Sequence, residues 1–324
     1  MKLSFIIPCY RSEKTVMAVI DEIVEKVKER PEYGYEIITV NDGSPDNVLA
    51  VLLTEAESRP YLKVIDLARN FGQHAAMMAG LSYAEGEYII FQDDDAQCPV
   101  DKLWELLKPL DEGYDISTAQ YNLRERKESF FRRAGSWFND CMMQIMLEKP
   151  RETYLANFFA IKRFVAEEML RYKNPYPYMD GLLLRTSRKI ASVPMADRER
   201  LSGTSTYTLR KLINLILNGF TAFSIKPLRI ATFLGTLTSF FGFLFGLYVI
   251  IRKLLYPELI DDGYSSLMAV ILFVGGMIML LLGICGEYIG RIYICINNSP
   301  QYVVRQAVNV GLESGKEEQN GSVS

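Results

Sequence analysis

Residues 88–97 read Tyr-Ile-Ile-Phe-Gln-Asp-Asp-Asp-Ala-Gln, an apolar run that ends in three consecutive carboxylates. Short apolar runs rich in β-branched and aromatic residues are typical of buried strands. In α/β sheets the ligand binds outside the carboxyl ends of the strands. We therefore expect residues 88–92 to form a strand, and Asp93, Asp94 and Asp95 to lie in a binding site at its end.

Four similar runs place residues 88–92 in a larger sheet. They are Leu3–Ile7, Glu36–Val40, Leu62–Asp66 and Tyr114–Thr118, with segments of helical period between most of them. Alternating strands and helices predict an α/β fold with a mostly parallel sheet.

The phosphate-binding motifs of two common α/β classes are missing from the sequence. No GxGxxG follows the first run, and no GxxxxGK[ST] occurs anywhere. This argues against dinucleotide-dependent hydride transfer and against P-loop hydrolysis. Carboxylates face a diphosphate only with a cation between them, so the acidic strand ends predict a nucleotide ligand and a divalent cation.

Composition excludes other classes of function. The formal net charge is −3 over 324 residues, which argues against a nucleic-acid partner. His74 is the only histidine, so zinc sites with several histidines are excluded. The five cysteines form no CxxC pair, and we expect reduced thiols.

Two stretches near the C-terminus, residues 230–251 and 264–286, contain no charged residue. Each is long enough to cross a hydrocarbon core of about 30 Å, so a transmembrane hairpin is predicted. The alternative is a pair of buried core helices, which unbroken apolar runs of this length disfavour. More basic residues flank the hairpin than lie in its loop, which predicts cytoplasmic termini and a multi-pass protein of the cell (inner) membrane.

Three further segments complete the predicted organisation. Residues 206–227 have the apolar period of an amphipathic helix, which we expect to lie in the headgroup plane rather than in a soluble core. A basic run with interleaved aromatic residues covers 124–138, and a solvated helix face or an anion site would explain it equally well. The predicted parts are a cytoplasmic catalytic domain (1–205), the interfacial helix (206–227), the hairpin (228–292) and a C-terminal segment (293–324) whose tail is disordered.

Five motifs in order resemble those of polyprenyl-phosphate glycosyltransferases. They are Ile7-Pro8-Cys9-Tyr10, Val40-Asn41-Asp42-Gly43-Ser44-Pro45-Asp46, Arg69-Asn70-Phe71-Gly72, Asp93-x-Asp95-x-Gln97 and Arg200-x-x-Gly203-x-Ser205-x-Tyr207. These are inverting family 2 enzymes related to dolichol-phosphate mannose synthase and to bacterial undecaprenyl-phosphate glycosyltransferases. The similarity extends through the hairpin to Gly286-Glu287-Tyr288-Ile289-Gly290-Arg291, and so covers nearly the whole chain.

The resemblance implies an A-type glycosyltransferase fold, a Rossmann-like domain that binds a nucleotide sugar. It also implies a Mg²⁺ or Mn²⁺ ion between the donor diphosphate and the carboxylates of Asp93 and Asp95, with Asp94 secondary. The implied donor contacts are Pro8, Tyr10, Glu13, Asp42 and Gln97. The segment with Arg200, Ser205 and Tyr207 matches a loop near the diphosphate and the acceptor.

The resemblance implies an acceptor that carries a phosphate. We expect the basic run at 124–138 to bind it, because Arg side chains bind phosphate oxygens in bidentate fashion. By position, the acceptor residues are Arg126, Arg132, Arg133 and Ser136, and Arg200 contacts either the acceptor or the diphosphate. Two residues depart from the family pattern. Asn157 stands where some relatives carry an Asp, so either no base is needed or Asp180 supplies it, and position 206 is Thr where many relatives have Lys.

The predicted activity is the transfer of a hexose from a nucleotide sugar, UDP-linked, to polyprenyl phosphate with inversion. One alternative is a processive polysaccharide synthase, which the missing Q-x-x-R-W motif disfavours. Another is a catalytically silent membrane scaffold that binds nucleotide sugar or lipid, which the intact D-x-D disfavours. Glycines in the two apolar stretches predict close helix packing and a homo-oligomer.

Overall fold

The computed structural model describes residues 1–121, 144, 149–150, 153–196, 226–255, 264–297 and 299–310. The chain divides into two compact units, Met1–Leu212 with Asn298–Ser324 and Ile213–Asn297. Seven predicted site residues lie outside the described ranges, as do residues 206–225 of the amphipathic helix. These site residues are Arg126, Arg132, Arg133, Ser136, Arg200, Ser205 and Tyr207.

The first unit contains an eight-stranded mixed sheet of order β7-β5-β6-β4-β1-β2-β3-β8. Neighbours among β1 to β4 are parallel, whereas β6 is antiparallel to β4 and β5, and β8 is antiparallel to β3. The strands are β1 (Lys2–Cys9), β2 (Gly34–Asn41), β3 (Leu62–Leu67), β4 (Tyr88–Phe91), β5 (Ile116–Tyr121), β6 (Phe159–Lys162), β7 (Ile190–Met195) and β8 (Val304–Val308). All five predicted strands occur, and the predicted α/β fold is confirmed.

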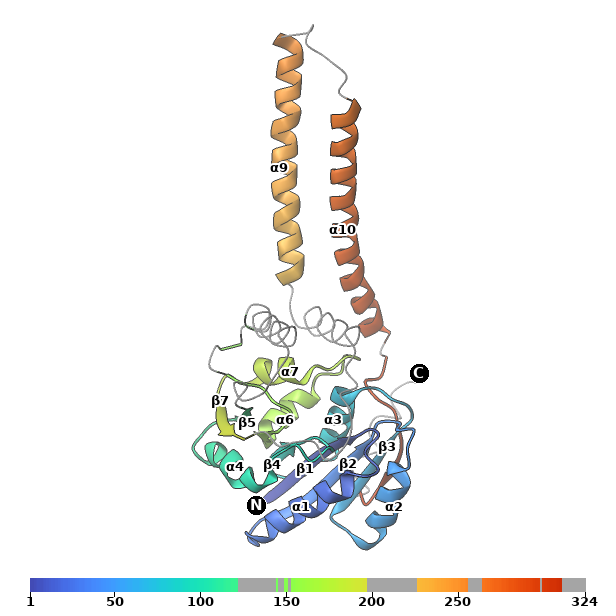
Figure 1. Cartoon of the computed structure of the whole chain (residues 1–324), viewed down its shortest axis with the longest axis vertical. Coiled ribbons are helices and arrows are strands. Elements are labelled where there is room, and N and C mark those ends of the chain that lie inside the picture. The colour runs from blue at the N-terminus through green and yellow to red at the C-terminus, as the bar shows by residue number, and fades with distance from the viewer. Residues whose placement is uncertain are drawn as a thin grey trace, which may run out of the picture. The chain divides into compact units, whose positions relative to one another are not determined.

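Helices cover both faces of this sheet (Figure 1). The apolar residues of α1 recur every three or four positions and are buried on the core formed with β1 and α4. On the opposite face α3 packs so closely that a Cβ on Gly80 would lie 2.6 Å from Ile6. The helices are α1 (Val16–Lys28), α2 (Val48–Ser58), α3 (Gln73–Ser82), α4 (Leu103–Asp111), α6 (Arg163–Leu170) and α7 (Met179–Thr186), with a 3₁₀ turn at Val100–Lys102.

A partly buried ion cluster joins the amino ends of the strands. The carboxylate of Glu36, on β2, lies 2.7 Å from Lys2 and 2.9 Å from Lys63. Both lysines also contact Glu85, and these contacts lower the pKa of that carboxyl to about 2. The cluster lies at the opposite edge from the carboxyl ends of β1 to β4, so it stabilises the sheet without entering the predicted site.

Strand β8 was not anticipated from the sequence. It follows the two apolar helices, yet it pairs with β3 and forms one edge of the sheet in the first unit. Asn309 fixes its end by donating to the carbonyl oxygens of Ala56 (2.8 Å) and Leu62 (2.9 Å). Because the chain enters and leaves the helical pair from one domain, both ends of that pair lie on the same side of any membrane it crosses.

The second unit contains α9 (Lys226–Leu255) and α10 (Tyr264–Ile296). Both include windows long and apolar enough to span a membrane, Ala231–Tyr248 and Phe273–Ile296. Their apolar side chains are exposed, for example Phe243 at 70% and Met279 at 72%, unlike those of a buried core helix. Helix α10 continues ten residues beyond the predicted end at residue 286, through Glu287 and Arg291 to Ile296.

Candidate active site

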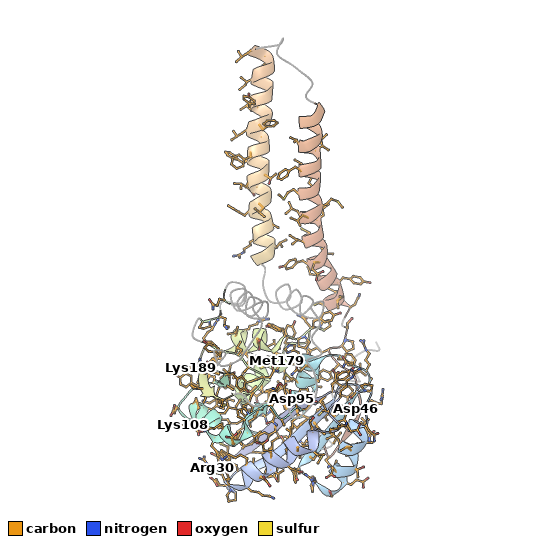
Figure 2. The ribbon with its side chains drawn as sticks, viewed as in Figure 1. Arg30, Asp46, Asp95, Lys108, Met179 and Lys189 are labelled. Carbon is orange, nitrogen blue, oxygen red and sulfur yellow. The ribbon has the colours of Figure 1, made fainter. Side chains whose placement is uncertain are left out.

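The polar residues that follow β1, β2 and β4 meet at one edge of the sheet. The loops after β2 and β4 carry Asp46 and Asp95, which are labelled in Figure 2. The loops after β1 and β4 contact each other directly, since Asp94, after β4, accepts the backbone N–H of Tyr10, after β1, at 3.0 Å. The strand ends therefore form one continuous polar site.

Asp93 is held by two side-chain amides. Gln73, the first residue of α3, donates to Oδ1 at 2.7 Å, and Asn157, just before β6, donates to Oδ2 at 2.8 Å. Burial, together with the charges of Asp95 and Asp94, raises the pKa of Asp93 to about 6, although both amides favour the ionised form. The two amides fix the direction of this carboxylate.

Asp95 begins a strained turn. Its Oδ1 accepts the backbone N–H of Gln97 at 3.1 Å, and the intervening Ala96 has φ of +61°, a conformation rare for residues other than glycine. Such strain concentrates at functional sites. The turn fixes Asp95 and Gln97 relative to each other.

The loops after β1 and β2 are joined around Glu13. The backbone N–H of Glu13 donates to Asp46 Oδ2 at 3.0 Å, and its own carboxylate accepts the N–H of Asn47 at 3.2 Å. Glu13, Asp46 and Arg11 line a hollow of about 400 Å³. Tyr10 is 43% exposed, so its ring is accessible to a ligand.

Asp42 is turned inward. It is 3% exposed, and its two oxygens accept the backbone N–H groups of Phe71 (2.7 Å) and Gly72 (2.9 Å). Burial raises the pKa of Asp42, and these two hydrogen bonds oppose the rise. Asp42 thus fastens the loop after β3 to the end of β2, a structural task that the sequence did not reveal.

Asp180, in the first turn of α7, accepts the hydroxyl of Tyr178 at 3.2 Å. Burial raises the pKa of its carboxyl. The same segment meets α3, because the backbone N–H of Met179 donates to His74 Nδ1 at 3.4 Å. His74 follows Gln73, so the start of α7 and Asp93 are held by adjacent residues of α3.

The histidine contact makes a pH-dependent prediction. Burial lowers the pKa of His74 from 6.5 to about 4, so the unfolded chain takes up the proton first as the pH falls. The stability contributed by the neutral ring is complete above pH 6.5 and is lost progressively as the pH falls from 6.5 to 4. Between pH 7 and pH 5 we expect wild type to lose about 2 kcal/mol relative to His74→Gln. Denaturant unfolding of both proteins measures this, and parallel pH profiles would contradict it.

The residues present fit a divalent cation. Mg²⁺ is commonly held by one or two carboxylates, substrate phosphates and water rather than by an all-protein cage. Within the described ranges no group of three or more His, Cys, Asp or Glu side chains is placed to hold a metal. Asp93 and Asp95 supply two hard carboxylates, and each carboxylate oxygen has two lone pairs, so Asp93 keeps acceptor capacity beside its amides.

Comparison with known proteins agrees with this architecture. The model of glycosyl transferase family 2 matches residues 4–170, and that of the GtrB C-terminal hairpin matches residues 226–292. A bactoprenol glucosyl transferase derived from prophage SfII, in Shigella flexneri, is 32% identical over 95% of this chain and 98% of its own. An undecaprenyl-phosphate 4-deoxy-4-formamido-L-arabinose transferase of Serratia proteamaculans is 34% identical over 95% of this chain and 94% of its own.

A solved structure supports the fold. Mannosyl-3-phosphoglycerate synthase from Rubrobacter xylanophilus superimposes with a TM-score of 0.51 at 19% identity, over 67% of this chain and 71% of that one. The sheet and its neighbours are those of an A-type glycosyltransferase. The chain belongs to glycosyl transferase family 2 and is a glycosyltransferase.

Proposed function

We propose that this enzyme transfers a hexose from a UDP-linked sugar to polyprenyl phosphate, with inversion at the anomeric carbon. The observation that carries the proposal is the combination, in one chain, of a family 2 domain and an apolar helical pair. Relatives that match nearly its full length are named for bactoprenol and for undecaprenyl phosphate. The product would be a polyprenyl-phosphate sugar used to modify cell-envelope glycans.

In this proposal the donor lies across the strand ends. Pro8, Tyr10, Glu13 and Asp42 are assigned to the nucleotide, and Gln97 to the donor or the metal. Mg²⁺ or Mn²⁺, held by Asp93 and Asp95, would neutralise the leaving diphosphate. The order imposed on the Asp93 carboxylate by Gln73 and Asn157 supports the assignment, because positioned charge needs no reorganisation during the reaction.

The acceptor phosphate is the nucleophile. One of its oxygens attacks the anomeric carbon as the bond to the diphosphate breaks on the opposite face, so an α-linked donor gives a β-linked product. The phosphate is already ionised near neutral pH, and positioning supplies most of the rate. Asp180 is the alternative base, and Arg126, Arg132, Arg133, Ser136, Arg200, Ser205 and Tyr207 are the proposed contacts of the acceptor and diphosphate.

We also propose that α9 and α10 cross the cell (inner) membrane with the catalytic domain on the cytoplasmic face, as the excess of basic residues flanking the pair predicts. The proposed homo-oligomer is supported by Gly242, Gly246, Gly275, Gly276 and Gly283, because a Cβ on any of them would meet open space. A monomeric mass in nanodiscs would contradict the oligomer.

Donor turnover tests the function. Purified protein in detergent is incubated with undecaprenyl phosphate, Mg²⁺ or Mn²⁺ and a panel of UDP- and GDP-sugars, and nucleoside diphosphate and glycolipid are measured. We expect metal-dependent glycolipid from one donor. Nucleotide-sugar binding without turnover would favour the silent scaffold, and a growing polysaccharide would favour the processive synthase.

Asn157 gives a second test of the same site. Asn157→Ala removes one of the two amides on Asp93, and we expect turnover to fall about tenfold. Asn157→Asp removes the same donor and adds a negative charge next to Asp93, so the loss at pH 7 should exceed that of the alanine variant. If Asn157→Asp turns over at the wild-type rate, the prediction is wrong, and the aspartate that some relatives carry at this position does not impair the reaction.

A further inference from the structure

Arg305 lies on β8 at an irregular point of its pairing with β3. Asp66 is opposite Gln306 and Leu67 is opposite Val304, so Arg305 is an extra residue in the β8 strand. Such β-bulges redirect a side chain and are frequent next to active sites. Here the bulge turns the guanidinium towards the carboxyl end of β3.

The guanidinium contacts two groups of that strand end. Nη1 lies 3.3 Å from Asp66 Oδ2, and Nη2 donates to the carbonyl oxygen of Ala68 at 2.7 Å. Asp66 is 3% exposed, and a buried carboxylate that loses its counter-charge is strongly destabilised. Arg305 therefore compensates this buried carboxylate and holds it in place.

The other oxygen of Asp66 leads to the loop after β2. Asn41 Nδ2 donates to Asp66 Oδ1 at 2.7 Å, which fixes the orientation of the Asn41 amide. The Oδ1 atom of the same Asn41 amide accepts the backbone N–H of Ser44 at 3.1 Å. The Asp66 carboxylate thus determines where Ser44 lies.

Ser44 joins the loops after β1 and β2. Its hydroxyl donates to Asp46 at 2.5 Å and accepts the backbone N–H of Arg11 at 2.8 Å. Asp46 holds Glu13 as described above. Arg305 also lines, with Asn41, Ser44 and Asp46, a hollow of about 440 Å³ beside these loops. A continuous path of hydrogen bonds therefore runs from β8 to the donor side of the site.

We propose that Arg305 is a positioning residue for the nucleoside part of the donor. By pairing with Asp66 it orients Asn41, and through Ser44 and Asp46 it positions the two loops that hold the nucleotide. This inference rests on the proposed function for the chemical class of the ligand, a nucleoside diphosphate. The inference predicts that replacing Arg305 weakens donor binding alone.

The test uses the full-length protein in detergent. In Arg305→Ala we expect the donor KM, and the Kd for UDP or GDP with Mn²⁺, to rise about tenfold, while kcat and the acceptor KM stay near wild type. Arg305→Lys keeps the charge but loses the fork, and should rescue part of the loss. Asn309→Ala is the matched control, because Asn309 holds the same strand without contacting Asp66. It should lower the Tm without changing the donor KM.

A double variant keeps the test valid if Arg305→Ala does not fold. Asp66→Asn removes the buried charge, so adding Arg305→Ala to it should change nucleotide Kd little further. An unchanged donor KM and Kd in folded Arg305→Ala, or equal rises in Arg305→Ala and Asn309→Ala, would overturn the inference. Nucleotide binding without glycolipid formation would refute the proposed acceptor reaction alone, whereas failure of wild type to bind UDP or GDP would overturn both.

Discussion

Replacing Asp95 with alanine should lower metal-dependent sugar transfer by at least about a thousandfold, because charge stabilisation at the leaving group is lost. The fold should survive, since Asp95 is in a surface turn at the end of β4 rather than in the apolar core. Glycolipid formation in the donor panel measures the effect, and circular dichroism verifies the fold.

Asp21→Ala provides the matched control for Asp95. Asp21 is a carboxylate on α1 that pairs with Arg59 at 2.6 Å, with its side chain 57% exposed. Exposed ion pairs contribute about 0–1 kcal/mol to stability, so turnover should remain at the wild-type level. Equal losses in the two variants would show that Asp95 has no special part in the reaction.

Replacing Gly43 with alanine should destabilise the catalytic domain by about 3 kcal/mol, through backbone strain and steric overlap. Gly43 has φ of +58°, and a Cβ there would lie 2.6 Å from the backbone of Arg69 and Asn70. That backbone cannot move away freely, because Asp42 and Asn70 tie the same loop to β2. Denaturant unfolding measures the loss.

Gly34 is the comparison for Gly43, since it lies at the start of β2 and a Cβ there would have no neighbour within 4 Å. Gly34→Ala should change stability by less than about 0.5 kcal/mol. If the two variants are equally stable, the turn after β2 tolerates a side chain and the strain argument is wrong.

The central strands could be predicted because their residues are apolar on both faces. β1 to β4 lie between helices, so nearly every side chain is buried and the sequence shows an unbroken apolar run. β8 could not be predicted in this way. It is an edge strand with Arg305 and Gln306 exposed, and only its pairing with β3 defines it.

In the candidate active site, too, some residues could be predicted from the sequence and others could not. The acidic residues after β4 were recognisable, because their type and position belong to a short motif. The amides that hold Asp93 were not, since Gln73 and Asn157 lie 20 and 64 residues away and are joined to it only by the fold. The two carboxylate hydrogen bonds of Asp42 to backbone N–H groups were hidden for the same reason.

The position of β8 also has a consequence for biosynthesis. Chains emerge from the ribosome from the N-terminus, and β3 is an open sheet edge until residues 304–308 have been made. Both apolar helices are translated before those residues. The sheet is therefore completed last, after both apolar helices have been synthesised, and a chain stalled before that point carries an unpaired strand edge that can pair with another chain.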